Sequence, residues 1–126
     1  MASMGSSEKF CLKWNDFRSN LTSSFSEQRD NPDFTDVTLA CDDQGQLTAH
    51  RVILSASSSF FRDMLSKQKH PNLLIYMRGF KSRDLNYLLD FVYHGEVNIY
   101  QEDLNRFMAI AEELGLKANN SSFILL

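Results

Sequence analysis

Side chains that could support catalysis or bind a metal ion are scattered along this sequence. The three histidines, His50, His70 and His94, are far apart, and none belongs to an HxxxH or cysteine-rich arrangement of metal ligands. The serine run at 55–59 has no base placed to activate a hydroxyl group, and the chain contains neither a Gly-x-Ser-x-Gly element nor a glycine-rich phosphate loop. These features predict that the chain is not an enzyme and that it uses no cofactor and no metal ion.

The remaining polar candidates have structural explanations. Asp42 and Asp43 begin a stretch typical of a turn, in which Gly45 is expected to take the positive φ that closes the loop. His50 is interpreted as a hydrogen-bonded core histidine rather than a ligand. The two cysteines, at 11 and 41, have no metal-site spacing and form no disulfide framework, which favours a reduced intracellular compartment.

Composition narrows the classes of function further. A chain of 126 residues, 43% hydrophobic and 23% charged, is typical of one soluble globular domain. Its net charge is −3 and its 13 Lys and Arg residues are scattered, so direct contact with nucleic acid is not expected. No apolar run reaches the ~20 residues that a membrane span needs. Residues 1–9 are expected to be a flexible leader or tag, 10–117 the domain, and 118–126 a tail whose apolar end has no assigned role.

The pattern of apolar residues predicts a small sheet with helices around it, in α+β order. The central unit is a hairpin, with alternating apolar residues at 37–41 and 47–49, followed by two short helices. The first helix begins with a buried run at 52–54, and the serines at 57–59 offer a cap for the second. The later expectations are an internal strand at 73–77, a helix capped by Ser82 and stopped by Gly95, a short strand at 97–99 and a helix from 102 to 114.

The N-terminal part carries large apolar side chains outside this central unit. An alternating set predicts a short strand, and a set at four-residue intervals predicts a helix with a narrow apolar stripe. Periodicity alone leaves open whether the stripe packs on its own domain or on a partner. The residues are Phe10, Leu12 and Trp14 in the strand and Phe17, Leu21 and Phe25 in the helix.

Four blocks of sequence are similar to a known family. The blocks at 34–39 (FTDVTL), 49–61 (AHRVILSASSSFF) and 93–97 (YHGEV) resemble those of a BTB/POZ domain. The block at 10–17 (FCLKWNDF) resembles the N-terminal extension of the insect tramtrack-type subgroup, found in tramtrack, longitudinals-lacking and batman-like proteins. The resemblance covers about residues 10–117, and the blocks occur in the right order.

The resemblance implies a function in self-association. The first helix would form a dimer interface and the strand before it would pair between subunits, which extends assembly beyond two chains and allows other tramtrack-type domains as partners. The full-length protein would be a nuclear transcription or chromatin regulator, whose DNA-reading zinc fingers lie elsewhere.

Two other roles occur among BTB proteins. Substrate adaptors for cullin-type ubiquitin ligases usually carry a hydrophobic-x-Glu element after the second helix, but 64–74 contains no Glu. Channel tetramerisation domains adjoin a membrane segment, and none is present nearby. The adaptor role remains the alternative to self-association.

Asp36 and Arg51 match an acid and a base that lie close together at the dimer interface of BTB domains. We therefore predict that they are close partners, and that Asp36→Asn lowers solubility or self-association in size-exclusion chromatography. Elution and solubility equal to those of the unaltered chain would contradict this role.

Overall fold

The computed structural model describes residues 7–117. The expectations for residues 1–6 and for the tail at 118–126 therefore lie outside the described residues. Within the described part, the helices and strands follow one another in the order α1 (Phe17–Gln28), β2 (Val37–Cys41), β3 (Gln46–Ala49), α2 (Arg51–Ser57), α3 (Ser59–Ser66), β4 (Leu73–Met77), α4 (Ser82–His94) and α5 (Gln101–Glu113).

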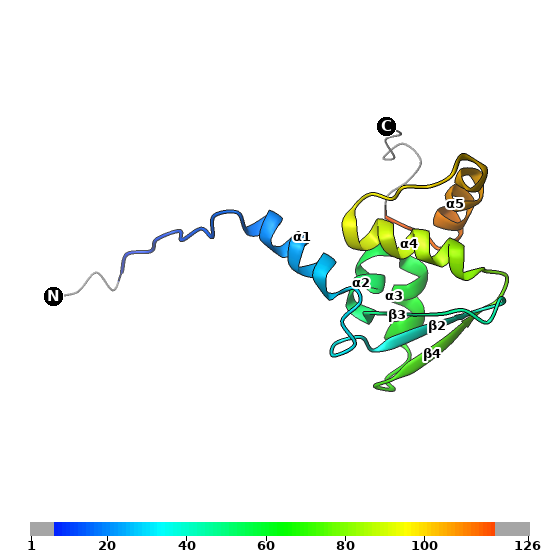
Figure 1. Cartoon of the computed structure of the whole chain (residues 1–126). Helices are drawn as coiled ribbons and strands as arrows, with labels where there is room; N and C mark the ends of the chain where they lie inside the picture. Colours follow the sequence, from blue (N-terminus) through cyan, green and yellow to red (C-terminus); the bar gives the residue numbers. More distant parts are fainter. Residues whose placement is uncertain (1–6, 118–126) are drawn as a thin grey trace.

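The sheet is mixed and three-stranded, in the order β3-β2-β4. Strand β2 pairs with β3 in an antiparallel and with β4 in a parallel sense. Its alternation points Val37, Leu39 and Cys41 toward the helices, which gather on one face of the sheet (Figure 1). The α+β class expected from the sequence is confirmed.

The core lies between this face of the sheet and helices α2 to α5. Its largest fully buried side chains come from both layers, so the sheet and the helices stabilise each other by burying apolar surface. These side chains are Phe61, Leu39, Leu54, Leu85, Leu88, Leu89 and Leu114.

The turn between β2 and β3 differs from the expectation in one respect. The residue with positive φ in this turn is Gln44, at 66°, and not Gly45. Gly45 is required for another reason: a Cβ atom there would lie 2.6 Å from Cβ of Ser82, so only glycine allows α4 to approach the turn this closely.

The two aspartates of this turn connect it to the segment after β4. Asp42 accepts hydrogen bonds from the hydroxyl of Tyr76 and, at 2.8 Å, from the backbone N–H of Gly79. Asp43 accepts from the hydroxyl of Ser82 at 2.8 Å and from its backbone N–H. These bonds, led by those from Tyr76 and Ser82, lower the pKa of both carboxyl groups.

Asp43 therefore accepts a hydrogen bond from the free N–H at the start of α4, the capping role that the sequence assigned to Ser82. The side chain of Ser82 does not cap α4, because the helix begins at Ser82 itself and Lys81 occupies the N-cap position without a side-chain cap. The other expected cap is confirmed: Ser58 accepts from the N–H of Phe61 at 3.1 Å and donates to the carbonyl of Leu114.

Strand β4 is an edge strand, so its predicted internal position was wrong. Its apolar side chains do face both ways, but only one face is covered, and Leu74 and Tyr76 are each 59% exposed on the other. Val52 was also misplaced, because it lies on the open side of α2 and is 70% exposed.

Two predicted strands are not formed within the chain. Residues 8–14 and 96–100 have no assigned helix or strand. A strand needs a neighbouring strand to satisfy its backbone groups, and among residues 7–117 neither segment has one. Val97 and Ile99 instead pack against the edge of the core as partly buried side chains.

Phe61 provides a direct test of the core. It is fully buried, whereas its neighbour Phe60 on the same helix is 38% exposed. We expect Phe61→Ala to lower the free energy of unfolding by about 3–5 kcal/mol, because it removes an aromatic side chain and leaves a cavity. Urea unfolding followed by circular dichroism measures this loss. Phe60→Ala is the matched control, and an equal loss in both variants would contradict this description of the core.

Candidate interaction surface

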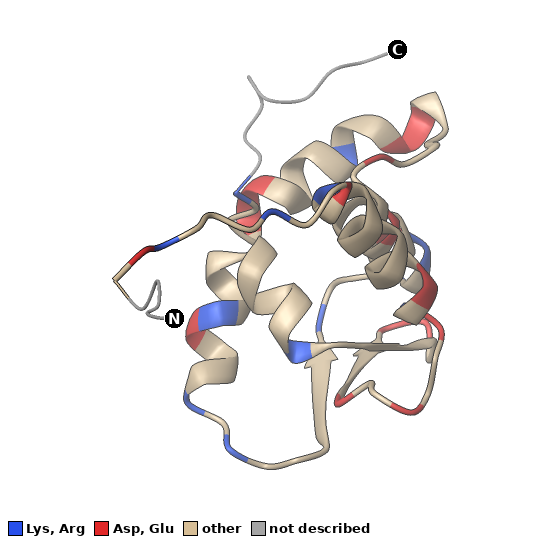
Figure 2. Cartoon of the chain, turned by 90° about the vertical axis from the view of Figure 1, so that its left-hand side faces the viewer, with Lys and Arg blue, Asp and Glu red and all other residues tan. Residues whose placement is uncertain are grey.

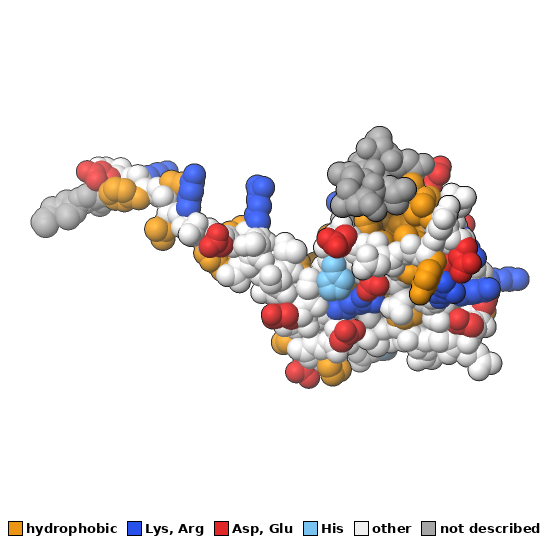
Figure 3. Space-filling view, turned by 45° about the horizontal axis from the view of Figure 1, so that its top comes forward, with side chains coloured by type: hydrophobic (Ala, Val, Ile, Leu, Met, Phe, Trp, Pro, Cys, Tyr) orange, Lys and Arg blue, Asp and Glu red, His pale blue; other side chains and the backbone are white. Residues whose placement is uncertain are grey.

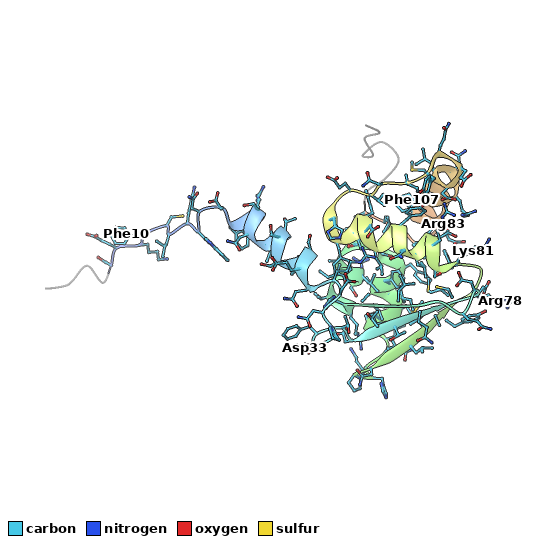
Figure 4. The ribbon with its side chains drawn as sticks, viewed as in Figure 1. Phe10, Asp33, Arg78, Lys81, Arg83 and Phe107 are labelled. Carbon is cyan, nitrogen blue, oxygen red and sulfur yellow. The ribbon has the colours of Figure 1, made fainter. Side chains whose placement is uncertain are left out.

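The N-terminal arm, defined as residues 8–28, projects from the body of the molecule (Figure 1). It consists of the unpaired segment 8–14 and helix α1, and Phe10 lies far from the body (Figure 4). No residue of α1 is buried. The arm is therefore almost entirely available to a partner.

The arm carries all six apolar residues that the sequence identified for self-association. Their exposed fractions fall from the free segment toward the body, and Figure 3 shows hydrophobic side chains along the arm. The values are Phe10 85%, Leu12 97%, Trp14 62%, Phe17 44%, Leu21 38% and Phe25 41%. In this chain they form a stripe of uncovered apolar surface rather than a packed layer.

The last turn of α1 attaches the arm to α4. Arg29, which follows the helix, forms an ion pair with Asp90 and donates a 2.7 Å hydrogen bond to the amide oxygen of Asn86. Ser26 donates to the carbonyl of Tyr93 at 3.2 Å. Arg29 is only 12% exposed in its side chain, so this joint, defined by Arg29, Asp90 and Asn86, is partly shielded from water.

A groove of about 110 Å³ lies beside this joint, where α1 meets α2 and α4. Its lining is apolar apart from Gln28 and His50, and it receives side chains from four separate parts of the chain. We call this the foot groove, and its lining residues are Phe25, Gln28, Phe34, His50, Val52, Ile53 and Tyr93.

His50 is a buried, hydrogen-bonded histidine, as the sequence indicated, and its partner in the structure is Tyr93. The backbone N–H of His50 donates to the Tyr93 hydroxyl at 2.9 Å, and His50 Nδ1 lies 2.6 Å from the same oxygen. Burial raises the pKa of Tyr93, so the phenol keeps its hydrogen. The hydrogen of this hydroxyl has a partner when His50 Nδ1 accepts it, and in that arrangement Nε2 carries the ring proton.

Asp36 and Arg51 meet, but through the backbone of Arg51. The carboxylate of Asp36 accepts a 2.7 Å hydrogen bond from the backbone N–H of Arg51, the first residue of α2. This contact satisfies one of the free N–H groups at the start of the helix and places a negative charge at its positive end. Asparagine could still accept the bond, so Asp36→Asn tests the charge separately from the hydrogen bond.

The guanidinium of Arg51 points elsewhere. It donates to the backbone carbonyls of Leu65 at 2.9 Å and His70 at 2.8 Å, and also to that of Gln68. These groups lie at the end of α3 and in the connector that follows, where carbonyl groups lack partners within the helix. Arg51 therefore holds α2, α3 and the connector together.

Two basic side chains, Arg83 on α4 and Arg106 on α5, lie in ion pairs with neighbouring acids. Arg83 pairs with Asp103 at 2.5 Å, and Arg106 pairs with Asp84 at 2.9 Å and with Asp103 at 3.1 Å. Figure 2 shows positive and negative residues interspersed around the body. This arrangement neutralises charge locally instead of concentrating it.

Residues 7–117 contain neither a candidate metal site nor a candidate membrane-spanning helix. This part of the chain contains no group of three or more His, Cys, Asp or Glu side chains that could hold a metal ion. None of its helices has both the length and the apolar character needed to cross a membrane. The arm and the foot groove present apolar surface that is uncovered in the single chain.

Sequence reasoning missed the foot groove. Its members come from residues 25–93, and only Phe25 belonged to the predicted stripe. One member of the groove, Val52, was expected in the core beside the buried Leu54. In the structure it lies on the open side of the short helix α2 and lines the groove instead.

A family model and curated relatives both match most of this chain. The BTB/POZ domain family matches residues 25–121. In Drosophila melanogaster, the Broad-complex core protein isoforms are 45% identical over 113 residues, covering 88% of this chain and 15% of that protein. Longitudinals lacking protein-like is 41% identical over 114 residues, covering 90% of this chain and 89% of that protein. The chain thus spans a small part of the first relative and most of the second.

A solved structure shares the fold. The BTB domain of zebrafish PATZ1 superimposes with a TM-score of 0.71 at 22% identity, covering 84% of this chain and 86% of that one.

The joint can be tested by removing the charge of Arg29. We expect Arg29→Met to speed amide hydrogen exchange in the last turn of α1, because the ion pair with Asp90 and the bond to Asn86 are both lost. Hydrogen exchange followed by mass spectrometry measures this effect. Arg18→Met on the exposed part of α1 is the control, and equal exchange in the two variants would show that the joint does not hold the helix.

Proposed function

The chain belongs to the BTB/POZ family, and from that premise we propose that it is a self-association module whose arm packs against a second copy. One observation carries this proposal: six large apolar side chains on the arm remain exposed in the single chain. Burying a side chain of this size contributes roughly 1.5–3 kcal/mol, so the stripe supplies a substantial driving force for association.

A second copy of the chain is the simplest partner for this stripe. Two equal helices related by a two-fold axis perpendicular to them run antiparallel, and each then covers the apolar residues of the other. Centred on Leu21, such a pair places Phe17 of each helix against Phe25 of the other. The same three residues therefore supply both sides of the interface.

The two unpaired segments extend the proposal. Residues 8–14 and 96–100 both have alternating apolar side chains, and their backbone groups have no strand partner within the described residues. Pairing of the segment 8–14 with 96–100 of another copy would satisfy these groups by strand addition. Because each chain carries both segments, strand exchange can link more than two chains and can accept related domains with a similar arm.

We propose further that the complete protein is a nuclear transcription or chromatin regulator. The domain itself has a net charge of −3, with 16 acidic residues against 13 Lys and Arg, so targeting to DNA would be supplied by other parts of the protein. A pull-down with the N-terminal region of a cullin tests the alternative role as a ubiquitin-ligase adaptor.

Leu21, at the centre of the stripe, provides the test of self-association. We expect Leu21→Asp to weaken self-association at least roughly tenfold, because it replaces a buried apolar contact with a desolvated charge. Molar mass from light scattering over a dilution series measures the change from assembled chains to the 14.5 kDa monomer.

Asn20→Asp on the same exposed helix is the matched control, since it adds the same charge beside the stripe. A chain without residues 1–16 should form smaller assemblies than the full chain. If the unaltered chain is monomeric at every concentration, the proposed function is wrong.

A further inference from the structure

Strand β4 has one edge that no other strand covers. It is the last strand in the order β3-β2-β4, and Leu73 donates its backbone N–H to the carbonyl of Asp36 at 3.4 Å, on the side of β2. Successive residues of a strand direct their backbone groups to opposite sides, so those of Leu74 and Tyr76 point away from β2. Among residues 7–117 no strand lies on that side to pair with them.

The same two residues carry exposed apolar side chains. Leu74 and Tyr76 are each 59% exposed on the open face of the sheet, beside Thr38 and Ala40 of β2. The strand reads LLIYM and has neither a charged residue nor a proline, the devices that commonly protect an edge from pairing. This edge is therefore open to another strand through its backbone and through its side chains.

We propose that β4 pairs in an antiparallel sense with β4 of a second copy, in a contact separate from that of the arm. A pair centred on Ile75 sets Leu74 of one copy opposite Tyr76 of the other. Residues opposed in this way exchange both backbone hydrogen bonds, so the outward groups of Leu74 and Tyr76 are all satisfied. Each leucine side chain then packs against a tyrosine ring on the open face. Beyond the strand, Arg78 lies opposite the uncharged Asn72.

The distribution of charge favours a second copy in this orientation. The connector before β4 carries Lys67 and Lys69, and no acidic residue lies between it and the end of the strand. The other end of the strand carries both signs, from Asp42, Asp43, Arg78 and Lys81. Antiparallel pairing places each basic connector against this mixed end of the other copy. Parallel pairing would instead set the two basic connectors side by side.

The edge is placed so that it can pair while the arm is also bound. Strand β4 forms the lower border of the body in Figure 1, whereas the arm leaves the body on the left. The apolar stripe of the arm lies before residue 26 and shares no residue with β4. Pairing at the edge would therefore link chains that the arms have already joined, and would extend one sheet across both copies.

Amide hydrogen exchange at single residues tests the contact. The N–H groups of Leu74 and Tyr76 have no strand partner in the single chain and should exchange quickly when it is dilute. Those of Leu73 and Ile75 face β2 and should be protected at every concentration. We expect exchange at Leu74 and Tyr76 to slow at least roughly tenfold at the concentrated end of the dilution series. Nuclear magnetic resonance measures these rates residue by residue.

A charge on the open face provides the matched comparison. Leu74→Glu would face Tyr76 of the other copy, whose hydroxyl is bonded to the carboxylate of Asp42, so two negative charges would come together. We expect this variant to weaken edge pairing at least roughly tenfold and to leave association through the arm unchanged. Thr48→Glu adds the same charge at an exposed position of the same face, on β3 and outside the contact, and should behave as the unaltered chain.

The outcomes separate edge pairing from the proposed function. Slowed exchange at Leu74 that survives Leu21→Asp and Thr48→Glu, but not Leu74→Glu, would support it. Exchange that is equally fast at every concentration of the unaltered chain would overturn edge pairing and leave association through the arm intact. Loss of the protection in a chain without residues 1–16 would also overturn it, because the strand on the edge would then be the arm of another copy.

Discussion

The joint between Arg29 and Asp90 determines how much of the apolar surface of the arm stays uncovered. It attaches only the last turn of α1 to α4, with help from Asn86 and Ser26. A helix attached along its length would bury its own apolar stripe. Since this helix is held at one end by polar contacts, the stripe remains uncovered in a single chain, and its burial becomes available to a partner.

Several elements could be predicted because their signals are local. The alternation at 37–41 gave β2, and the four-residue spacing after residue 17 gave α1, because each pattern follows from the geometry of its own segment. Strand β4 was misjudged for the opposite reason. Apolar side chains on both faces suggested an internal strand, but the place of a strand in a sheet depends on which segments pair with it, and periodicity contains no information on pairing.

The contacts that position the elements could not be predicted from spacing. Asp43 bonds the start of α4, 39 residues further along the chain, while Ser82 was the local candidate for that role. Asp36 and Arg51 were expected together as a charged pair on grounds of resemblance. The structure brings them together through the backbone: Asp36 accepts from the N–H of Arg51, whereas the guanidinium of Arg51 bonds carbonyls near the end of α3. The foot groove, assembled from four parts of the chain, was beyond local reasoning for the same reason.

The separation of the arm from the body has an evolutionary consequence. Residues 8–21 make no core contact, so substitutions there escape the requirement for folding stability that constrains residues such as Leu39 or Phe61. After gene duplication, two copies could diverge in this segment and acquire distinct binding preferences while keeping an identical scaffold. Changes in this segment would alter the apolar surface that the arm offers to a partner without altering the scaffold.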